Sequence, residues 1–452
     1  MIRKTKLMMV YGAMIGFATA SCTHAETQKP EEKQRVIAMT DGEIDDWSSM
    51  IRFLLYTSDF DVEAIIETNS VWQREGHSRE TWLEDQLGAY ESVYPNLIKH
   101  HEGYPTADAL RALCYVGDED STHLAGIRNS KEQVPGAPVE ILPDGWEDTP
   151  GSERIIEILL KDDPRPVHIQ AWGGGNTLSR ALHKLKAEFP DRYDEAVAKT
   201  VVYNVSYQDD AGNYIEQYHP GVTMIHCTSF SGTWNYRVQT DTYDFIRDEV
   251  KNNHGPLGAL YPQDYVSEGD SPAFMYVIAN GLRNYAHPTW GGWGGRFTKT
   301  KKAPNTYRNA VDDDDNGDKR HAMRRWVSAS NADFQARMDW CVAERYEDAN
   351  HPPKVRVDVG TDITVKSGET VTLDASGSED PDGDKLTFNW WQYREVGTYD
   401  RLVDFSGSDQ QAITFTAPDV EEPKTIHFIV EAKDDGVPSL VGYQRVVVEV
   451  VP

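Results

Sequence analysis

The segment Val36–Asp46 constrains the fold of this chain more than any other stretch of its sequence. An apolar run ends there in four carboxylates within six residues, and residues 47–56 follow with the pattern of an amphipathic helix. The carboxylates belong to Asp41, Glu43, Asp45 and Asp46. A strand, a turn and a helix in this order place the acids at the carboxyl end of a strand, where open α/β sheets bind their ligands.

Two interpretations of this acidic turn stay open at the level of the sequence. Crowded carboxylates repel one another, and a hard divalent cation such as Ca²⁺ or Mg²⁺ takes oxygen ligands almost exclusively, so the cluster predicts a metal or polyol site. Asp45 and Asp46 can instead stabilise a helix N-terminus, where negative charge is favourable. Helix capping accounts well for one aspartate and poorly for four acids, so we expect the metal or polyol site.

Further along the chain, strand-like runs alternate with helical ones, which predicts a mostly parallel sheet with helices on both faces. After the first strand, further strands are expected at residues 62–67, 166–171 and 200–207. Helices are expected at residues 79–100, 153–161, 178–189 and 331–345. Ser152 is the expected N-cap of the second of these helices. The fold class of this part of the chain is therefore α/β.

The charge of the chain argues against a nucleic-acid polymer as its partner. The 452 residues include 45 Lys and Arg against 73 Asp and Glu, a formal net charge of −28. Such a surface repels phosphate backbones. Twelve Trp and 22 Tyr offer rings on which sugars and bases stack, although most of them must be core residues.

The N-terminus has the pattern of an export signal. Basic residues at positions 3, 4 and 6 precede an apolar run over residues 7–20, which is too short for a membrane span. Residues 19–22 resemble a lipoprotein box, so we expect a signal over residues 1–22 and a lipid on Cys22 as the only membrane attachment. Cleavage after Ala20 or Ala25 would instead release the protein. The expected location is the periplasm, the outer membrane or cell surface, or the medium.

After residue 350 the alternation of strand-like and helical runs gives way to short strand-like runs alone. Short strands are expected at residues 354–359, 370–373, 385–391, 412–416, 425–432 and 444–451. This is the pattern of a β-sandwich, and the run Leu373–Trp390 resembles polycystic-kidney-disease (PKD) type immunoglobulin-like modules. We therefore expect a linker over residues 23–34, an α/β domain over 35–350 and an all-β immunoglobulin-like sandwich over 351–452.

Several blocks together resemble the inosine–uridine-type nucleoside hydrolases. Thr40–Asp46 is similar to the aspartate cluster that follows the first strand of that superfamily. Three further blocks agree with it: Ala64–Asn69, Ala171–Leu178 and Glu268–Pro272. Gly291–Arg296 and the C-terminal β-module are typical of an exported branch, the cellulose-binding, nucleoside-hydrolase-like proteins. The resemblance covers nearly the whole mature chain and implies a Rossmann-type, mostly parallel sheet.

The resemblance also implies a Ca²⁺ ion in a cleft and roles for the residues around it. The implied metal ligands are the carboxylates of Asp41, Asp46 and Asp270 and the carbonyl of Asn176. Asp45 matches an acid that holds a sugar hydroxyl, and Asn69 lies near a second sugar-contacting position. Asp41 is the implied base, which takes a proton from the water that attacks the anomeric carbon.

The chain departs from that superfamily at two positions. Met39 replaces the first aspartate of an Asp-x-Asp pair, and Gly269 stands where a histidine can protonate a leaving base. Glu268 is the candidate replacement for this acid, with His287 as an alternative. The loss of the histidine argues against nucleosides and in favour of oligosaccharides as substrates.

Three more residues are candidates for contact with a sugar. Gln208 and Asp209 end a strand on the expected active face, where a solvated turn is the alternative interpretation. Trp293 lies between glycines, where it can form a sugar platform or fill a loop against the core.

The expected function is Ca²⁺-dependent hydrolysis of a glycosidic bond in an oligo- or polysaccharide. The first alternative is a protein that binds carbohydrate without cleaving it, and the second is a nucleoside hydrolase. Relatives in the superfamily are often oligomeric, so a homo-oligomer is compatible with the resemblance.

Overall fold

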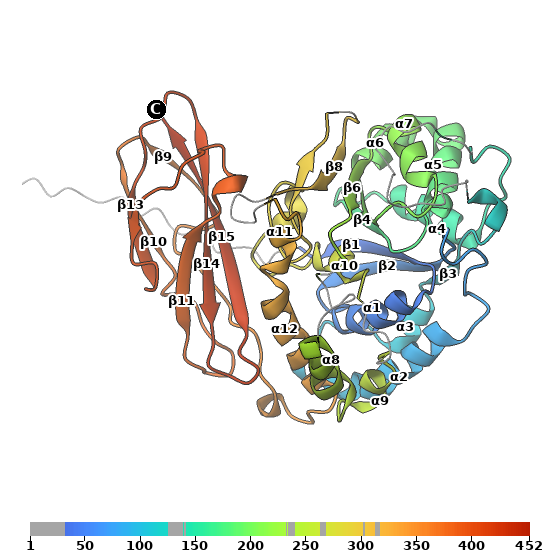
Figure 1. Cartoon of the computed structure of the whole chain (residues 1–452), viewed down its shortest axis with the longest axis horizontal. Helices are drawn as coiled ribbons and strands as arrows, with labels where there is room; N and C mark the ends of the chain where they lie inside the picture. Colours follow the sequence, from blue (N-terminus) through green and yellow to red (C-terminus); the bar gives the residue numbers. More distant parts are fainter. Residues whose placement is uncertain are drawn as a thin grey trace, which may run out of the picture.

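The computed structural model describes residues 32–124, 139, 142–231, 233, 240–262, 268–301, 303–311 and 317–452. The expected signal peptide, with Cys22, and most of the linker at 23–34 lie outside the described residues. The chain forms an α/β domain followed by an all-β domain (Figure 1). None of the described helices combines the length and apolar character needed to cross a membrane.

The α/β domain is built on one eight-stranded sheet, and this confirms the predicted fold class. The strands are β1 (Gln34–Thr40), β2 (Phe60–Glu67), β3 (Cys114–Val116), β4 (Val167–Ala171), β5 (Thr200–Val205), β6 (Thr223–Cys227), β7 (Phe297–Lys299) and β8 (Thr306–Asn309). Their order is β3-β2-β1-β4-β5-β6-β8-β7, and every neighbouring pair is parallel except β7 with β8. The strand order reverses between β1 and β4, so ligands are expected at the carboxyl ends of these two strands.

Helices cover both faces of the sheet (Figure 1). One core contains side chains from α1 (Ile44–Leu55), α2 (Trp82–His100), α3 (Ala107–Arg111), α8 (Thr240–Ile246), α9 (Gly255–Ala259), α10 (Ser271–Met275), α11 (His321–Arg324) and α12 (Val327–Trp340). The opposite core contains side chains from α4 (Pro150–Leu159), α5 (Asn176–Glu188), α6 (Pro190–Ala198) and α7 (Ala211–Tyr218). Along β1, Val36 and Ala38 face the first core while Ile37 and Met39 face the second, as the two-residue period of a strand requires. Met39 is therefore a core residue.

The expected elements correspond to observed ones, with shifts at their ends. The helix predicted at 153–161 begins at Pro150, because Thr149 is its N-cap. The side chain of Thr149 accepts a hydrogen bond from the backbone N–H of Ser152, and the Ser152 hydroxyl interacts with the backbone N–H of Thr149. Ser152 is thus the third helical residue of a capping box. The prediction of Ser152 as the cap itself was wrong by one helical turn.

The C-terminal domain consists of two sheets that enclose a core around Trp390 (Figure 1). One sheet has the order β10-β13-β12 and the other the order β11-β14-β15-β9. The strands are β9 (Asp362–Lys366), β10 (Thr370–Asp374), β11 (Thr387–Gln392), β12 (Phe405–Ser406), β13 (Ala412–Thr416), β14 (Lys424–Lys433) and β15 (Val441–Val451).

The strand predicted at 354–359 is not present in the structure. In this segment the backbone N–H of Arg356 donates to the Ser378 hydroxyl, and that of Val357 donates to the Gln444 side chain. The β-bridge in this segment, between Lys354 and Glu379, is isolated and does not extend into a strand. At Arg356 and Val357, side chains thus take the hydrogen bonds that a neighbouring strand would make. The sheet is joined later by β9, which runs parallel to β15.

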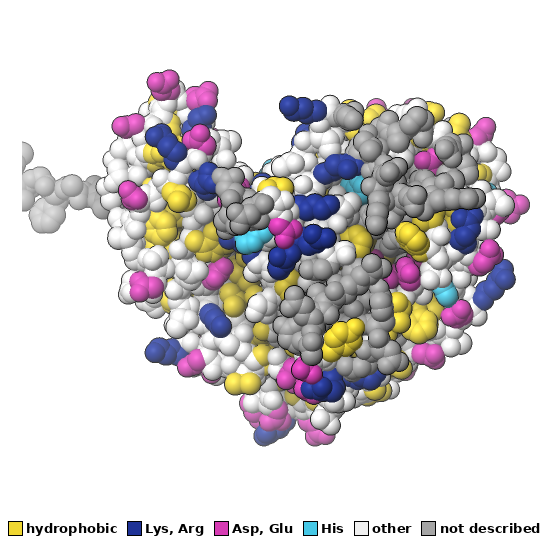
Figure 2. Space-filling view, in the orientation of Figure 1, with side chains coloured by type: hydrophobic (Ala, Val, Ile, Leu, Met, Phe, Trp, Pro, Cys, Tyr) yellow, Lys and Arg dark blue, Asp and Glu magenta, His cyan; other side chains and the backbone are white. Residues whose placement is uncertain are grey.

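The two domains share a continuous hydrophobic core. Tyr443 of β15 packs edge-on against Trp326 and Trp293, and all three belong to the same buried cluster as the sheet of the α/β domain. Arg445, which is fully buried, donates hydrogen bonds to the backbone oxygens of Leu282 and Gly291, each at 2.6 Å. In the space-filling view the domains are separated by a notch at the upper edge and continuous below it (Figure 2).

Candidate metal centre

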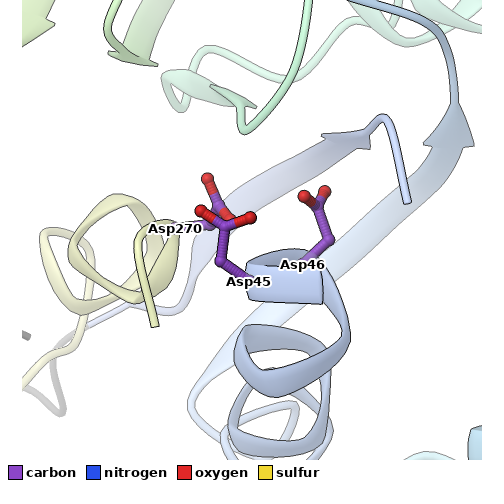
Figure 3. A group of neighbouring side chains, drawn as sticks. All are labelled: Asp45, Asp46 and Asp270. Carbon is purple, nitrogen blue, oxygen red and sulfur yellow. The ribbon is translucent and has the colours of Figure 1, made fainter. Parts of the chain in front are cut away.

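Three aspartates from distant parts of the chain converge beside the carboxyl end of β1. Asp45 and Asp46 lie in the first turn of α1, and Asp270 immediately precedes α10. Their side chains point into the same space (Figure 3). Each offers one carboxylate oxygen, and these oxygens all lie within 4.8 Å of one another. Asp46 and Asp270 are 2% and 1% exposed, whereas Asp45 is half-buried.

The carboxylates of this cluster disfavour one another's charge. Burial raises the pKa of Asp46 well above its usual value, and the charges of Asp41, Asp270 and Asp45 raise it further, while a hydrogen bond from Thr40 opposes them. Burial likewise raises the pKa of Asp270, followed by the charges of Asp45, Asp41 and Glu43. Both effects act against the ionised form, so a bound cation would relieve them.

Two carboxylate oxygens, one in the cluster and one on the neighbouring Asp41, have no partner in the part of the chain that the structure describes. Oδ2 of Asp41 and Oδ2 of Asp270 are buried and accept no hydrogen bond from a described residue. Buried polar atoms in native proteins are almost always paired. Buried carboxylate oxygens without such partners, on Asp270 and on the neighbouring Asp41, fit a hard divalent cation.

Asp41 is held in place by its neighbours on the turn. It follows β1 directly, and its Oδ1 accepts a hydrogen bond from the Glu43 backbone at 3.3 Å. Its backbone N–H donates to Asp46 at 3.2 Å. Gly42, with a φ of 73°, allows the turn between them. Asp41 is not in the group of three whose oxygens come within 4.8 Å, but its charge acts on both Asp46 and Asp270.

The glycines after β4 allow the two loops at the strand-order reversal to approach closely. A Cβ atom at Gly173 would lie 2.6 Å from the Cβ of Asp41, closer than side-chain atoms tolerate. A Cβ at Gly174 would collide with the backbone oxygen of Asn69, to which Gly174 donates a hydrogen bond of 3.0 Å. These two glycines thus bring the loop after β4 against the acidic turn and Asn69.

Asn69 and Asn176 form one polar network beside the aspartates. The side-chain amide of Asn176 donates to Oδ1 of Asn69 at 2.9 Å, and its own Oδ1 accepts from Thr68 at 3.1 Å. Both asparagines are buried. The predicted role of the Asn176 carbonyl as a metal ligand stays a prediction, as does the predicted sugar contact of Asn69.

Asp209 has a structural function that its sequence context did not reveal. Its Oδ2 accepts hydrogen bonds from the backbone N–H groups of Gly175 at 2.7 Å and Asn176 at 2.9 Å, and its Oδ1 accepts one from Ala211 at 2.9 Å. Burial raises the pKa of Asp209 to about 6, and these three N–H groups oppose that rise. The residue therefore joins the beginnings of α5 and α7, and it is not a solvated turn.

Gln208 also binds backbone groups. Its side-chain amide donates to the oxygens of Trp172 and, at 3.2 Å, of Val205. Its Oε1 is buried and accepts no hydrogen bond from the residues that the structure describes. The predicted sugar contact of Gln208 stays a prediction, with this oxygen as the atom that would make it.

The geometry of Glu268 argues against its predicted role as a catalytic acid. Both of its oxygens are bonded to Arg52, at 2.7 Å from Nε and 2.9 Å from Nη2, and both side chains are fully buried. Oε1 also accepts from Ser271 at 3.2 Å. Both oxygens of Glu268 are thus engaged as hydrogen-bond acceptors within the core, which leaves neither of them placed to donate to a leaving group.

Trp293 is a core residue at the junction of the two domains. It is 3% exposed, and its ring centroid lies 6.3 Å from that of Tyr443. His287, the alternative acid, packs against Trp290, with the ring planes tilted by 40° and the centroids 4.4 Å apart. Of the two interpretations of Trp293, its burial supports the one in which the ring fills a loop against the core, and a sugar contact by this ring stays a prediction.

Three residues of the site escaped the sequence analysis. Thr40 donates its hydroxyl proton to Asp46, Ser49 accepts a hydrogen bond from the backbone N–H of Asp270 at 3.3 Å, and Arg52 binds Glu268. Ser49 follows Asp45 by four residues and Arg52 follows Ser49 by three, so a helical projection would have placed them on one face. The partners of Ser49 and Arg52 are more than 200 residues away along the chain, so the sequence could not show these pairings.

Comparisons with known proteins agree with this architecture. Residues 35–297 match the family described as "Cellulose-binding Sde182, nucleoside hydrolase-like domain". Residues 370–450 match the family described as "Cellulose-binding protein Sde0182, C-terminal domain". No functionally curated protein matches the chain.

One solved structure is similar over almost the whole length. It is a nucleoside hydrolase-related hypothetical protein from Saccharophagus degradans, associated with carbohydrate metabolism. It is 32% identical, with a TM-score of 0.79 over 92% of this chain and 100% of the other.

Two further structures match more weakly. A PKD domain from the KIAA 1837 protein is 24% identical over 21% of this chain and 84% of its own, with a TM-score of 0.17. A plant nucleoside hydrolase is 14% identical over 68% of this chain and 98% of its own, with a TM-score of 0.36. Neither score is high enough to support an argument. The first family match spans more than half of the chain, and with it the chain belongs to the cellulose-binding, nucleoside hydrolase-like family.

Proposed function

We propose that this chain is an exported carbohydrate-binding protein that holds Ca²⁺ in its aspartate cluster and binds sugar hydroxyl groups there. The observation that carries the proposal is the cluster itself: Asp45, Asp46 and Asp270 bring carboxylate oxygens within 4.8 Å of one another, two of them from buried residues. Charges of one sign are not buried this closely without a partner. The family descriptions, which both include cellulose binding, support a carbohydrate as ligand.

Asp46 and Asp270 are the central metal ligands of this proposal. Asp45 has the geometry of a third, and Asp41 and the carbonyl of Asn176 are the further ligands that the family resemblance implies. When bound, a divalent cation supplies positive charge that offsets the crowded carboxylates and attracts the hydroxyl oxygens of a sugar. The polar network of Asn69 and Asn176 would complete the contact with the sugar.

Hydrolysis of the glycosidic bond is the second candidate function, and Asp41 favours it. Its Oδ2 is buried and accepts no hydrogen bond from a described residue, so it can take a proton from an attacking water. The neighbouring carboxylates would stabilise the positive charge that develops at the anomeric carbon. The leaving oxygen must also gain a proton, and Glu268 is engaged with Arg52. Carbohydrate binding without hydrolysis is therefore the first candidate function.

The first experiment is calorimetric titration of chelator-stripped protein with Ca²⁺. The wild type is expected to bind one ion per chain, and Asp46→Asn is expected to bind none. Asp162→Asn is the matched control, because that side chain is 93% exposed. No Ca²⁺ binding by the wild type, or equal binding by Asp46→Asn, would refute the metal site.

The second experiment addresses the sugar. Binding to insoluble cellulose and to soluble neutral oligosaccharides is measured with Ca²⁺ and with chelator, and the same mixtures are analysed for released sugar. Inosine and uridine are included as nucleoside substrates. Binding that depends on Ca²⁺ without release supports the first proposal, and release that is lost in Asp41→Asn supports hydrolysis. Carbohydrate binding that survives both the chelator and Asp46→Asn would contradict a role for the cluster.

A further inference from the structure

Trp72 is exposed in a way that no other described tryptophan is. Its side chain is 53% exposed, whereas the other tryptophans in the described part of the chain are buried or half-buried. Single exposed apolar residues are common on proteins and need no explanation by themselves. The position and the rigidity of Trp72 are what distinguish it.

Trp72 lies on the loop between β2 and α2, at the carboxyl edge of the sheet. The base of this loop is Asn69, whose backbone oxygen accepts a hydrogen bond from Gly174. The backbone N–H of Val71 donates to the oxygen of Gln208 at 2.9 Å. The side chain of Gln208 in turn binds the oxygen of Trp172, the residue before Gly173. Trp72 is thus connected, through one short series of contacts, to the loop that touches Asp41.

The loop is fixed in a tight turn. The hydroxyl oxygen of Ser70 accepts hydrogen bonds from the backbone N–H groups of Trp72 at 3.0 Å and Gln73 at 3.2 Å. The backbone N–H of Ser70 donates to Gln73 at 3.1 Å. The oxygen of Arg74 accepts the side-chain amide of Asn69 at 2.9 Å. A backbone fixed in this way loses little conformational freedom when a ligand packs on the ring that it carries.

The chemistry of an exposed indole restricts what it binds. Its flat, apolar face packs against another flat face, such as the C–H face of a pyranose ring or a nucleobase. The net charge of −28 disfavours polyanions, which include nucleic acids and acidic polysaccharides. Among nucleic acids and polysaccharides, a neutral sugar ring is the remaining match.

We propose that Trp72 is a stacking subsite for one sugar unit of a neutral oligo- or polysaccharide whose adjacent unit lies at the aspartate cluster. This inference rests on the proposed function and specifies its ligand: a chain of sugars that extends beyond the cluster, in contrast to a single sugar or a nucleoside. Trp72 sets the specificity for chain length and takes no part in metal binding.

The test compares ligands of increasing length on variants of the full chain. Calorimetry with neutral oligosaccharides of one to six units is performed on the wild type, Trp72→Ala and Trp72→Tyr. We expect Trp72→Ala to weaken binding of the longer oligosaccharides about tenfold and to leave binding of the monosaccharide and of Ca²⁺ unchanged. Trp72→Tyr, which keeps a stacking face, should restore most of the affinity.

Leu402→Ala is the matched control, because Leu402 is 68% exposed and lies on the other domain. If Trp72→Ala keeps the wild-type dependence on chain length, or loses no more affinity than Leu402→Ala, the subsite is refuted. An equal loss of affinity for the monosaccharide would also refute it, as would stacking of inosine or uridine in preference to the sugars.

The two proposals fail in different ways. If Asp46→Asn abolishes sugar binding at every length while Trp72→Ala changes nothing, the metal-centred function stands and the subsite falls. If sugar binding is independent of Asp46, the proposed function falls, and with it the subsite as defined by its neighbour at the cluster.

Discussion

The two ends of helix α1 carry buried charges that the protein treats in opposite ways. At the C-terminal end, Arg52 is fully buried and is bonded through two nitrogens to Glu268, which is equally buried. At the N-terminal end, Asp46 is buried among Asp41, Asp45 and Asp270, which raise its pKa, and a hydrogen bond from the Thr40 hydroxyl opposes that rise. Arg52 therefore has a counter-charge, whereas the described residues provide none for Asp46, six positions earlier in the same helix.

This difference supports the proposed position of the metal site. Burying a charge costs free energy unless it is paired, and proteins normally supply the partner from their own chain, as at Arg52. A second carboxylate beside the cluster, Asp209, is also satisfied internally, by three backbone N–H groups. The aspartates at the start of α1 are the contrasting case, and a cation from solution is the partner that fits them.

The largest effect is expected from breaking the pair at the end of α1. Glu268→Gln leaves the Arg52 guanidinium buried without a counter-charge, which should lower the free energy of unfolding by about 3–5 kcal/mol. Chemical denaturation measures it. Replacing both residues by methionine should recover part of the loss. A loss below that of an exposed control such as Asp162→Asn would show that the pair is not needed.

Asp209→Asn should destabilise the protein less. The side-chain NH2 of asparagine would face at least one of the backbone N–H groups that now donate to Asp209. Buried N–H groups would then be unpaired, which costs about 1–3 kcal/mol. Because those donors begin α5 at Gly175 and Asn176, Ca²⁺ affinity is expected to fall as well. Unchanged stability in denaturant would contradict this structural role.

Trp293→Phe tests the position of that tryptophan in the domain junction. The smaller ring leaves a cavity against Tyr443 and should lower stability by about 1–2 kcal/mol. Sugar affinity, measured by calorimetry, should stay at the wild-type value. A variant of normal stability with weakened sugar binding would restore the sugar platform that the sequence suggested.

The smallest effect has the opposite sign and comes from Asp46→Asn. The raised pKa of Asp46 means that the folded protein retains a proton that the unfolded chain has released. Stability is therefore lost as the pH rises from about 3.9, the usual carboxyl pKa, through the raised value. Asparagine avoids this loss, so the chelated variant should be more stable than the wild type at pH 7 by about 0.5–2 kcal/mol.

The difference should disappear towards pH 3, where both proteins are uncharged at this position. Ca²⁺ should raise the melting temperature of the wild type and leave that of Asp46→Asn unchanged. Thermal denaturation with Ca²⁺ and with chelator, at pH 3 to 8, measures both effects. A chelated variant less stable than the wild type at pH 7 would mean that Asp46 is a structural residue like Asp209.

The acidic turn could be predicted from the sequence because its information is local. A buried strand, four acids and an amphipathic helix lie within about twenty residues, and the periodicity of each element is visible without the fold. Asp270 is more than 200 residues away, and only the family resemblance connected it with the turn. The overall α/β class likewise followed from alternation along the chain.

Pairings between distant residues could not be predicted. Nothing in the sequence around Glu268 indicates that Arg52 binds it, so a buried ion pair was taken for an available acid. Trp293 was chosen for its glycine neighbours, but Gly292 and Gly294 serve close packing within the first domain: a Cβ at Gly292 would overlap Asn284, and one at Gly294 would overlap Tyr276. Exposure of a tryptophan depends on the whole fold, and for this reason Trp72 could not be recognised.

The shared core of the two domains has a consequence for how such chains diversify. Gly281 has a φ of 87°, and any side chain there would strike the backbone of Tyr443, while Arg445 reaches across to two carbonyls of the first domain. The C-terminal domain therefore cannot be replaced by another domain without changes to the first one. A lineage that exchanges it for another module must rebuild the face around Trp293 and Trp326 in the same step, or expose those rings to solvent and to aggregation.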